Sequence, residues 1–387
     1  MEGLVNLPNF PPAAMPALFH DLFRNRRVLL TGHTGFKGAW LSEWLLGLGA
    51  EVHGYALDPL PHALLFDQLN LHNRIAADHR ADIMDRDRLT AVTRDTAPDF
   101  VFHLAAQPLV RLSYDQPVET FAVNVMGSVH MLDALRLAAH PCTVIMVTTD
   151  KCYENREWLH PYRESDPMGG HDPYSASKGA AEIAIAAYRR SFFDSPDSPV
   201  RVASARAGNV IGGGDWAPDR IVPDAIRAVL AGQPVPVRNP HATRPWQHVL
   251  EPLSGYLQLA AAIHAASHNL PCASPAPLDA LTSGFNFGPA VSANQSVGSL
   301  VAALLSHTGG SWTTAADPSA PHEASKLHLA TEKAYHLLGW EPAWQFPDTV
   351  RMTAAWYLQS AKGSDPAGLT RSQISEFSQS SNSHLLP

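Results

Sequence analysis

A glycine-spaced turn between an apolar run and a helical segment constrains this chain more than any other feature of its sequence. The turn, Thr31 to Gly38 (TGHTGFKG), follows the short apolar run 26–30 and leads into 38–48, where tryptophans and leucines recur at helical spacing. Glycines at these positions let the backbone turn tightly and approach a pyrophosphate at the positive end of the helix. Strand, turn and helix in this order therefore favour a dinucleotide site over an ordinary tight turn.

Runs of apolar and β-branched residues recur along the first half of the chain. Residues 100–104 (FVFHL) and 143–147 (TVIMV) are similar to the first run, and 118–135 between them carries apolar residues at helical spacing. Such runs are typical of strands buried on both faces of a parallel sheet. The alternation predicts an α/β fold: a doubly wound parallel sheet of the Rossmann type, with a smaller, mixed C-terminal substrate lobe.

Changes of composition along the chain predict its domains. Residues 1–24 form a proline-rich N-terminal extension, and 25–210 form the cofactor-binding Rossmann domain, with a later contribution from about 240–267. Pro/Gly-rich turns and shorter periodic segments assign 211–362 to the substrate-binding lobe. Residues 363–387 are rich in serine and show no apolar face, which predicts a disordered tail.

The charge balance excludes whole classes of function. The 28 Lys and Arg against 36 Asp and Glu give a net charge of −8, and only 17% of the residues are charged while 45% are hydrophobic. This composition describes a globular core and fits neither a disordered acidic chain nor a nucleic-acid binder. Any phosphate must therefore be bound by local geometry, because the overall field repels anions.

Cysteine content and the lack of long apolar runs indicate the compartment. The three cysteines, Cys142, Cys152 and Cys272, are too few and too scattered for a disulfide framework or a zinc site. Prolines interrupt the first twenty residues, and no apolar run approaches the roughly 18 residues of a membrane span. These features predict a cytoplasmic protein with no membrane partner.

The end of the second predicted strand bears on the choice of dinucleotide. The strand 51–57 ends at Asp58, about twenty residues past the last glycine, where a carboxylate could accept hydrogen bonds from a ribose diol. An acidic residue there favours NAD over NADP; the alternative is a turn aspartate before Pro59. Asp82 and Ile83, after the next strand, could hydrogen-bond to the adenine amino group; the alternative is that they form a surface turn.

A tyrosine and a lysine four residues apart carry the strongest chemical signal. Tyr174 and Lys178 (YSASK) share one face of a predicted helix that starts at Pro173, so the ammonium is expected to lower the pKa of the phenol and make it a usable base. The strand ending in 148–151 (TTDK) comes 25 residues before Tyr174 and supplies the Thr149 hydroxyl. A tyrosine and a lysine at this spacing often occur by chance. The nearby loop with Thr149 makes a catalytic role for the pair a stronger interpretation.

Together these motifs resemble the extended short-chain dehydrogenase/reductases that act on nucleotide sugars. Three further segments, TDKCYENREW at 149–158, MGGHDPY at 168–174 and RNP with RPWQHV within 238–249, resemble the CDP-glucose 4,6-dehydratases of that family. The resemblance covers about 26–357. It implies an NAD-dependent hydro-lyase that binds the nucleotide sugar CDP-glucose, with NAD in the first lobe and the sugar mainly in the second.

The resemblance also implies a reaction and its residues. NAD takes hydride from C4 of the glucose while Tyr174 removes the O4 proton, Lys178 holds the nicotinamide ribose and Thr149 bridges to O4. Water is then lost across C5 and C6, and the hydride returns to C6, giving a 4-keto-6-deoxy sugar. Asp150 is the acid for the C6 hydroxyl, which requires a raised pKa. Lys151 is either the C5 base, orients Asp150, or stabilises the enolate.

The remaining predicted site residues fall into two groups. Arginine forks match phosphate oxygens, so arginines near the lobe boundary are candidates for the diphosphate and cytidine. Asn124 is expected to tie the catalytic strand together by backbone contacts. Predicted for substrate are Asn209, Arg220, Arg238 and Arg244. Predicted for NAD are Gly32, Thr34, Gly35, Phe36, Lys37, Gly38, Asp58, Asp82, Ile83, Leu104, Ala105, Ala106 and Gln107, together with Thr149, Tyr174 and Lys178. No histidine pattern indicates a metal.

Three other functions stay open on the sequence. A 4-epimerase of the same fold returns hydride to C4 and needs no acid at C6. A 4,6-dehydratase that acts on another nucleotide sugar is the second. A non-catalytic NAD-binding scaffold is the third. The resemblance further implies a homodimer, paired through the helices that contain Asn124 and Tyr174, and a role in deoxysugar biosynthesis for lipopolysaccharide O-antigen.

Overall fold

The computed structural model describes residues 18–270, 274–315 and 326–382. Its centre is a seven-stranded sheet of order β3-β2-β1-β4-β5-β6-β11 in which every neighbouring pair is parallel. The strands are β1 (Arg27–Thr31), β2 (Glu51–Ala56), β3 (Ala77–Arg80), β4 (Phe100–His103), β5 (Cys142–Val147), β6 (Val200–Ala207) and β11 (Gly284–Phe287). This is the Rossmann strand order with one added strand, so the predicted fold class is confirmed.

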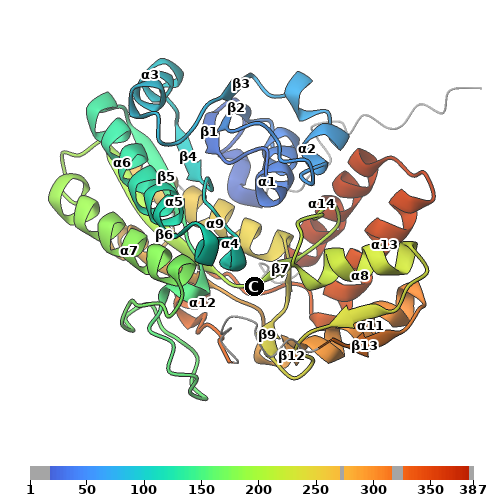
Figure 1. Cartoon of the computed structure of the whole chain (residues 1–387). Coiled ribbons are helices and arrows are strands. Elements are labelled where there is room, and N and C mark those ends of the chain that lie inside the picture. Colours follow the sequence, from blue (N-terminus) through green and yellow to red (C-terminus); the bar gives the residue numbers. More distant parts are fainter. Residues whose placement is uncertain (1–17, 271–273, 316–325, 383–387) are drawn as a thin grey trace, which may run out of the picture.

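Helices cover both faces of the sheet (Figure 1). Successive residues of each strand point to opposite faces: Leu29 enters the apolar cluster under α3, α6 and α7, whereas Val28 and Leu30 enter the cluster under α1 and α9. The helices of the two layers are α1 (Phe36–Gly47), α3 (Arg86–Thr96), α6 (Gly127–Ala138), α7 (Pro173–Tyr188) and α9 (Leu250–Ser267). Shorter helices complete this half: α2 (Leu65–Gln68), α4 (Val110–Asp115), α5 (Pro117–Phe121) and a π-helical turn at Ala122–Met126.

A second lobe lies beside the carboxyl ends of the strands, with α8, α11 and α13 at the right of Figure 1. Its two-stranded sheets pair β7 with β10, β8 with β13 and β9 with β12. The strands are β7 (Val210–Ile211), β8 (Val235–Val237), β9 (Thr243–Pro245), β10 (Gln247–His248), β12 (Asn294–Ser296) and β13 (Trp312–Thr314). The helices are α8 (Ile221–Leu230), α10 (Leu278–Leu281), α11 (Val297–Thr308), α12 (Glu332–Leu338) and α13 (Phe346–Ala361).

The chain returns from the second lobe to the sheet. Helix α9 packs against β5 and β6, within the range 240–267 that was expected to contribute to the first domain. Strand β11 also joins the sheet, paired with β6 from Gly284 opposite Ser204 to Phe287 opposite Ala207, although the sequence analysis assigned these residues to the substrate lobe. The reason is burial: Phe285 and Phe287 are fully buried on a strand too short to show a clear period.

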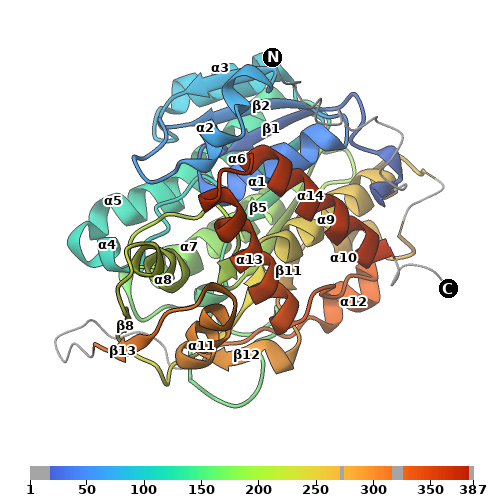
Figure 2. The same cartoon turned by 90° about the vertical axis from the view of Figure 1, so that its right-hand side faces the viewer.

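The prediction of a disordered tail is wrong for Pro366–Asn382, which form helix α14 (Figure 2). Ile374 and Phe377 are buried, and the Phe377 ring lies 5.8 Å from Trp44 of α1 and 5.0 Å from Trp344. Polar residues hide this face in the sequence, because the Thr370 hydroxyl accepts a hydrogen bond from Trp356 Nε1 at 3.1 Å and is itself buried. Residues 1–17 of the predicted extension and 383–387 of the tail lie outside the described residues.

Candidate active site

The glycine turn connects β1 to α1 at the centre of the sheet edge. Gly32 has φ of +74°, and a Cβ on it would lie 2.8 Å from Ala105 N; a Cβ on Gly38 would lie 2.2 Å from Gly32 O. Gly35 is different, since its Cβ would meet only Gly32 O, at 3.4 Å. No side chain caps α1 and no acidic residue lies in its first turn, so its positive end is open to an anion. This cradle fits a dinucleotide pyrophosphate.

Hydrogen bonds from β1 and Asn124 hold the loop after β4. The Thr31 hydroxyl accepts from Leu104 N and Ala105 N, both at 3.1 Å. Asn124 Oδ1 accepts from Gln107 N at 2.9 Å, and its amide donates to Gln107 O at 3.2 Å and to Ser177 Oγ on α7 at 2.9 Å. Asn124 thus makes backbone contacts, as expected, but to the loop after β4, and its amide also bonds a side chain of the helix that carries Tyr174; within the described residues it makes none to the catalytic strand β5.

The residues predicted for the adenosine half lie after β2 and β3. Asp58 and Asp82 are exposed, while Ile83 is buried beneath Gly127 of α6. Sequence reasoning missed Arg80, whose Nη1 donates to Leu57 O at 3.3 Å beside Asp58. Its position at the end of β3 becomes adjacent to the end of β2 only through the parallel pairing of Ala56 with Arg80.

The predicted catalytic residues come together at the ends of β5 and α7. The Thr149 hydroxyl donates to Asp150 Oδ1 at 3.0 Å, and it is within hydrogen-bonding reach of the Tyr174 phenol. Helix α7 begins at Pro173 because the Asp172 carboxylate caps it, accepting from Ser175 N at 2.9 Å. Tyr174 is partly buried, whereas Asp150 and Lys178 are buried.

Burial dominates the proton affinities at this site. It raises the pKa of Tyr174 to about 12 and lowers the pKa of Lys178 to about 8. The expectation that Lys178 lowers the phenol pKa is therefore wrong for the site as it stands, because desolvation of the phenolate outweighs the nearby charges. Burial also raises the pKa of Asp150, against the charges of Lys151, Arg244 and Lys37. A raised pKa is what a general acid requires.

Two of the predicted arginines lie near the catalytic residues. Arg220 donates to Asp215 Oδ2 at 2.9 Å, and its positive charge acts on the pKa values of both Tyr174 and Lys37. The Tyr357 hydroxyl bonds to the backbone oxygen of Asp215 and holds this turn in place. Buried Arg244 of β9 acts on Asp150 in the same way. Charged groups from 211–250 thus converge with the glycine turn.

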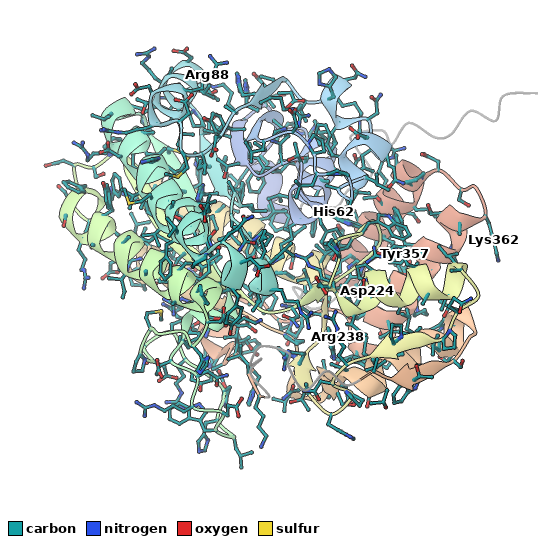
Figure 3. The ribbon with its side chains drawn as sticks, in the orientation of Figure 1. His62, Arg88, Asp224, Arg238, Tyr357 and Lys362 are labelled. Carbon is teal, nitrogen blue, oxygen red and sulfur yellow. The ribbon has the colours of Figure 1, made fainter. Side chains whose placement is uncertain are left out.

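Arg238 lies at the surface instead. Both of its terminal nitrogens donate to Asp219 Oδ1 at 3.0 Å, and Asp224 lies 3.7 Å away (Figure 3). Because Asp219 already binds its guanidinium, Arg238 is less available to bind a phosphate. Asn209 follows Gly208, a position that sequence reasoning did not assign to the site: a Cβ there would lie 2.6 Å from Asp150 Oδ2.

Lys37 and Lys151 approach Asp150 from two sides. Lys37 comes from the glycine turn, its ammonium 5.9 Å from the ring centre of Tyr256, and burial together with Arg220 lowers its pKa to about 8. Lys151 N donates to the Thr149 hydroxyl at 3.4 Å, and its side chain is only partly buried. The site therefore holds two lysines near its acid, where the sequence analysis considered only Lys151 as a base.

The described ranges contain neither a metal cluster nor a membrane-spanning helix. In residues 18–270, 274–315 and 326–382, no group of three or more His, Cys, Asp or Glu is placed to hold a metal ion. In the same ranges no helix has the length and apolarity needed to cross a membrane.

A dinucleotide cradle on this strand order, with Thr149, Tyr174 and Lys178 at its edge, defines an extended short-chain dehydrogenase/reductase. The family model for GDP-mannose 4,6-dehydratase matches residues 29–353. CDP-glucose 4,6-dehydratase of Salmonella typhimurium is 43% identical over 362 residues, which cover 92% of this chain and 97% of that protein. The chain belongs to this family of nucleotide-sugar 4,6-dehydratases.

Solved structures agree on the fold. An epimerase from Methanothermobacter thermautotrophicus matches with a TM-score of 0.73 at 20% identity, covering 91% of this chain and 97% of its own. The dTDP-glucose 4,6-dehydratase of Streptomyces venezuelae, solved with NAD bound, matches with a TM-score of 0.71 at 22% identity, covering 88% and 99%. The predicted family, fold class and hydro-lyase class are confirmed, and the predicted cofactor, NAD, is confirmed at the level of the family.

Proposed function

We propose that this chain converts CDP-glucose to CDP-4-dehydro-6-deoxyglucose, with NAD as a resident cofactor. The near full-length similarity to a CDP-glucose 4,6-dehydratase supports the choice of base and sugar. The observation that carries the reaction is Asp150, a buried carboxyl with a raised pKa that accepts a hydrogen bond from the hydroxyl of Thr149. An acid at this position suits the loss of the C6 hydroxyl as water.

Each residue of the site has its own role in the proposed reaction. The glycine turn and Lys178 would hold NAD, which would supply hydride transfer from C4 and back to C6. Tyr174 takes the O4 proton through the Thr149 hydroxyl; because its pKa is about 12, the phenol must first pass its own proton to solvent. Asp150 delivers a proton to O6. Lys37 and Lys151 are the candidates for the C5 base, and Lys37 has a pKa of about 8, close to neutrality.

Substrate contacts follow from the positive charges of the second lobe. Arg220 and Arg244 approach the catalytic residues from α8 and β9, so we assign them to the diphosphate. Asn209, beside the glycine that packs on Asp150, is assigned to the sugar. Arg238 has a weaker case, since Asp219 binds both of its terminal nitrogens.

The test is turnover of a panel of sugars. Purified protein is incubated with CDP-, UDP-, dTDP- and GDP-glucose, and products are identified by mass and by the absorbance of the enone in strong base. We expect CDP-glucose to give a product lighter by one water. If only another of these nucleotide sugars is turned over, that compound is the substrate. CDP-galactose as the sole product would identify a 4-epimerase. No turnover of any sugar, with NAD bound, would leave the scaffold function.

We also propose a homodimer that pairs through α5 and α7. These helices, the π-helical turn between α5 and α6, and the π-helical turn Arg189–Phe193 after α7 expose large apolar residues, which monomers rarely gather on one surface. They are Val118, Phe121, Met126, Ile183 and Phe192. Light scattering should give twice the chain mass, and the double variant Val118→Glu with Ile183→Glu should give the single mass. A wild-type monomer would contradict the pairing.

A cytoplasmic site and a place in deoxysugar assembly complete the proposal. The few, scattered cysteines suit a reducing cytoplasm, and a 4-keto-6-deoxy sugar suits later transamination or reduction for lipopolysaccharide O-antigen. Deletion of the encoding gene should shorten the O-antigen, as seen on silver-stained gels. Unchanged O-antigen would remove this part of the proposal and leave the enzymatic activity as it stands.

A further inference from the structure

A cavity of about 820 Å³ lies at the β11 edge of the sheet, outside the active site. The second half of α7, the segment 163–168 and the start of α12 surround it, whereas Tyr174 and Lys178 lie in the first half of α7. None of its lining residues belongs to the predicted catalytic, cofactor or substrate groups. The residues that line the cavity include Glu164, Glu182, Arg189, Arg206, Gly284 and Lys333.

Three cations face one another across this cavity. Arg206 is buried, Arg189 and Lys333 are partly buried, and burial lowers the pKa of the latter two. Carboxylates oppose this lowering, Asp194 and Glu182 at Arg189 and Glu164 at Lys333. The charge of Arg206 still lowers both pKa values, and Arg189 lowers that of Lys333, so the three cations are close enough to repel. Repulsion between partly desolvated cations is relieved by an anion bound among them.

The carboxylates that line the cavity do not neutralise its cations fully, because the lining holds four carboxylates (Glu164, Asp166, Glu182 and Glu332) against five cations, Arg163 and Arg190 besides these three. Glu182 accepts from Arg206 Nη2 at 2.8 Å and is occupied by it. Glu164 accepts from Asn286 N at 2.9 Å, and burial raises its pKa. Among the described residues no carboxylate lies within 4 Å of Arg189 or Lys333; the Lys333 ammonium donates only to the neutral oxygens of Ser283 and Gly284, both at 2.8 Å.

We infer that this cavity binds the phosphate group of a small metabolite. Two arginine forks and an ammonium match several phosphate oxygens at once. The volume lies within the usual range for small-molecule sites and exceeds what a bare ion requires, which favours a phosphate ester over free phosphate. Gly284 keeps the wall open, because a Cβ there would lie 2.7 Å from Arg206 Nη2.

The cavity is connected to the catalytic loop by hydrogen bonds. Glu182, bound to Arg206, accepts from the Thr148 hydroxyl at 2.5 Å, and Thr148 precedes Thr149 in the chain. Arg206 Nη1 also donates to the Tyr153 hydroxyl at 2.7 Å, on the other side of Asp150 in sequence. A phosphate that draws Arg206 toward the cavity loosens both attachments. Occupation of the cavity therefore lowers turnover while leaving substrate affinity unchanged.

Calorimetric titration of the full chain holding NAD tests the binding. Inorganic phosphate and glucose 1-phosphate are the two probes, so that a site for the free ion is distinguished from a site for the ester. We expect affinity to fall about tenfold in Lys333→Gln and in Arg189→Gln, since each removes one charged hydrogen-bond donor. Lys333→Arg should keep it. Lys362→Gln, at an exposed lysine of the C-terminal half, is the matched control.

Two further variants decide between the cavity and the active site. Ala186→Trp places an indole ring in the cavity and keeps every charge, so it should block binding of glucose 1-phosphate. Binding that is lost in Arg220→Gln and kept in Lys333→Gln and Ala186→Trp would overturn the inference, as would no binding of either probe.

Turnover tests the coupling separately. Phosphate should lower kcat in the wild type at unchanged KM and should have no effect in Ala186→Trp, whereas competition at the active site would raise KM. If kcat of the wild type is unchanged when phosphate is bound in the cavity, the coupling is overturned. The titrations do not require the proposed reaction, so a failed activity assay would not decide them.

Discussion

The amide of Asn124 donates a 2.9 Å hydrogen bond to the hydroxyl of Ser177, joining the π-helical turn to α7 three residues after Tyr174. The same side chain fixes Gln107 on the loop predicted to line the cofactor. One buried amide thus sets the distance between that loop and the helix of the catalytic tyrosine. The single wide turn of the helix around Asn124 places the amide between them.

Removing this amide is expected to cost both stability and activity. Asn124→Leu leaves Gln107 N and the Ser177 hydroxyl without their buried partner, and we expect a loss of about 1–3 kcal/mol in the free energy of unfolding. Chemical denaturation measures it. Asn124→Asp keeps the acceptor for Gln107 N and loses the donor to Gln107 O and Ser177 Oγ, so it should retain more stability than Asn124→Leu. Equal stability of Asn124→Leu and the wild type would contradict the role.

Asp150 is expected to set the alkaline limb of the pH profile. The acid must be protonated to act, and burial raises its pKa, so kcat should fall as the pH rises through that raised value. Asp150→Asn removes the proton and should lower kcat by about 10²-fold or more, with the limb no longer visible. Asp219→Asn, at the exposed partner of Arg238, is the control. An unchanged limb in Asp150→Asn would assign the acid to another group.

Glu251 makes stability depend on pH. It is fully buried in α9 and accepts from Ala343 N and Trp344 N at 3.0 and 2.7 Å, and burial raises its pKa to about 8. Because the folded pKa lies above the unfolded value, this contribution is complete below pH 4.5 and is lost as the pH rises to 8. Thermal unfolding across this window should show a decline in the free energy of unfolding of at most about 5 kcal/mol.

The isosteric variant isolates that contribution. Glu251→Gln cannot ionise, so its free energy of unfolding should be flatter than that of the wild type between pH 5 and 8. Glu51→Gln, at an exposed carboxylate beside His53, should keep the wild-type slope. Parallel curves for Glu251→Gln and the wild type would assign the decline to other groups.

Helix α14 is expected to be part of the stable core. Phe377→Ala removes a fully buried ring from between Trp44 and Trp344 and should cost about 3–5 kcal/mol. Gln379→Ala, at an exposed position two residues later, should change the free energy of unfolding by less than about 0.5 kcal/mol. Denaturation of both variants measures the difference. Equal stabilities would show that α14 is detached in solution.

The same helix shows why part of the fold could not be read from the sequence. Serine and glutamine dominate 363–387, and composition then predicts disorder. In the structure Thr370 and Gln373 are buried because each finds a hydrogen-bond partner on α13, Trp356 Nε1 and the Met352 oxygen. Partners of this kind exist only in the tertiary structure. The glycine turn and the doubly wound parallel sheet, by contrast, follow from local spacing and were predicted correctly.

Some features of the candidate site could likewise be predicted from the sequence, and others could not. Tyr174, Lys178 and Thr149 could be predicted because helix spacing and a strand end bring them together. Their proton affinities could not, since burial reverses the expected shift of the Tyr174 pKa. The approach of Lys37 and Arg220 to this group joins segments about 180 residues apart, which no local pattern reports.

The two glycines that flank the start of α1 are expected to fail in different ways. A Cβ on Gly38 would lie 2.2 Å from Gly32 O and 2.6 Å from His33 Cα, and backbone atoms in a packed turn cannot move aside, so Gly38→Ala should destabilise the fold by several kcal/mol (~3). Gly35 has no neighbour closer than 3.4 Å, so Gly35→Ala should fold normally. Its methyl group instead enters the cradle where the pyrophosphate would lie, and retention of NAD on purification should be lost. Denaturation and the NAD content of purified protein measure the two effects. If Gly35→Ala keeps its NAD, the cofactor does not approach this turn, and if Gly38→Ala is as stable as the wild type, the turn is wider than the structure shows.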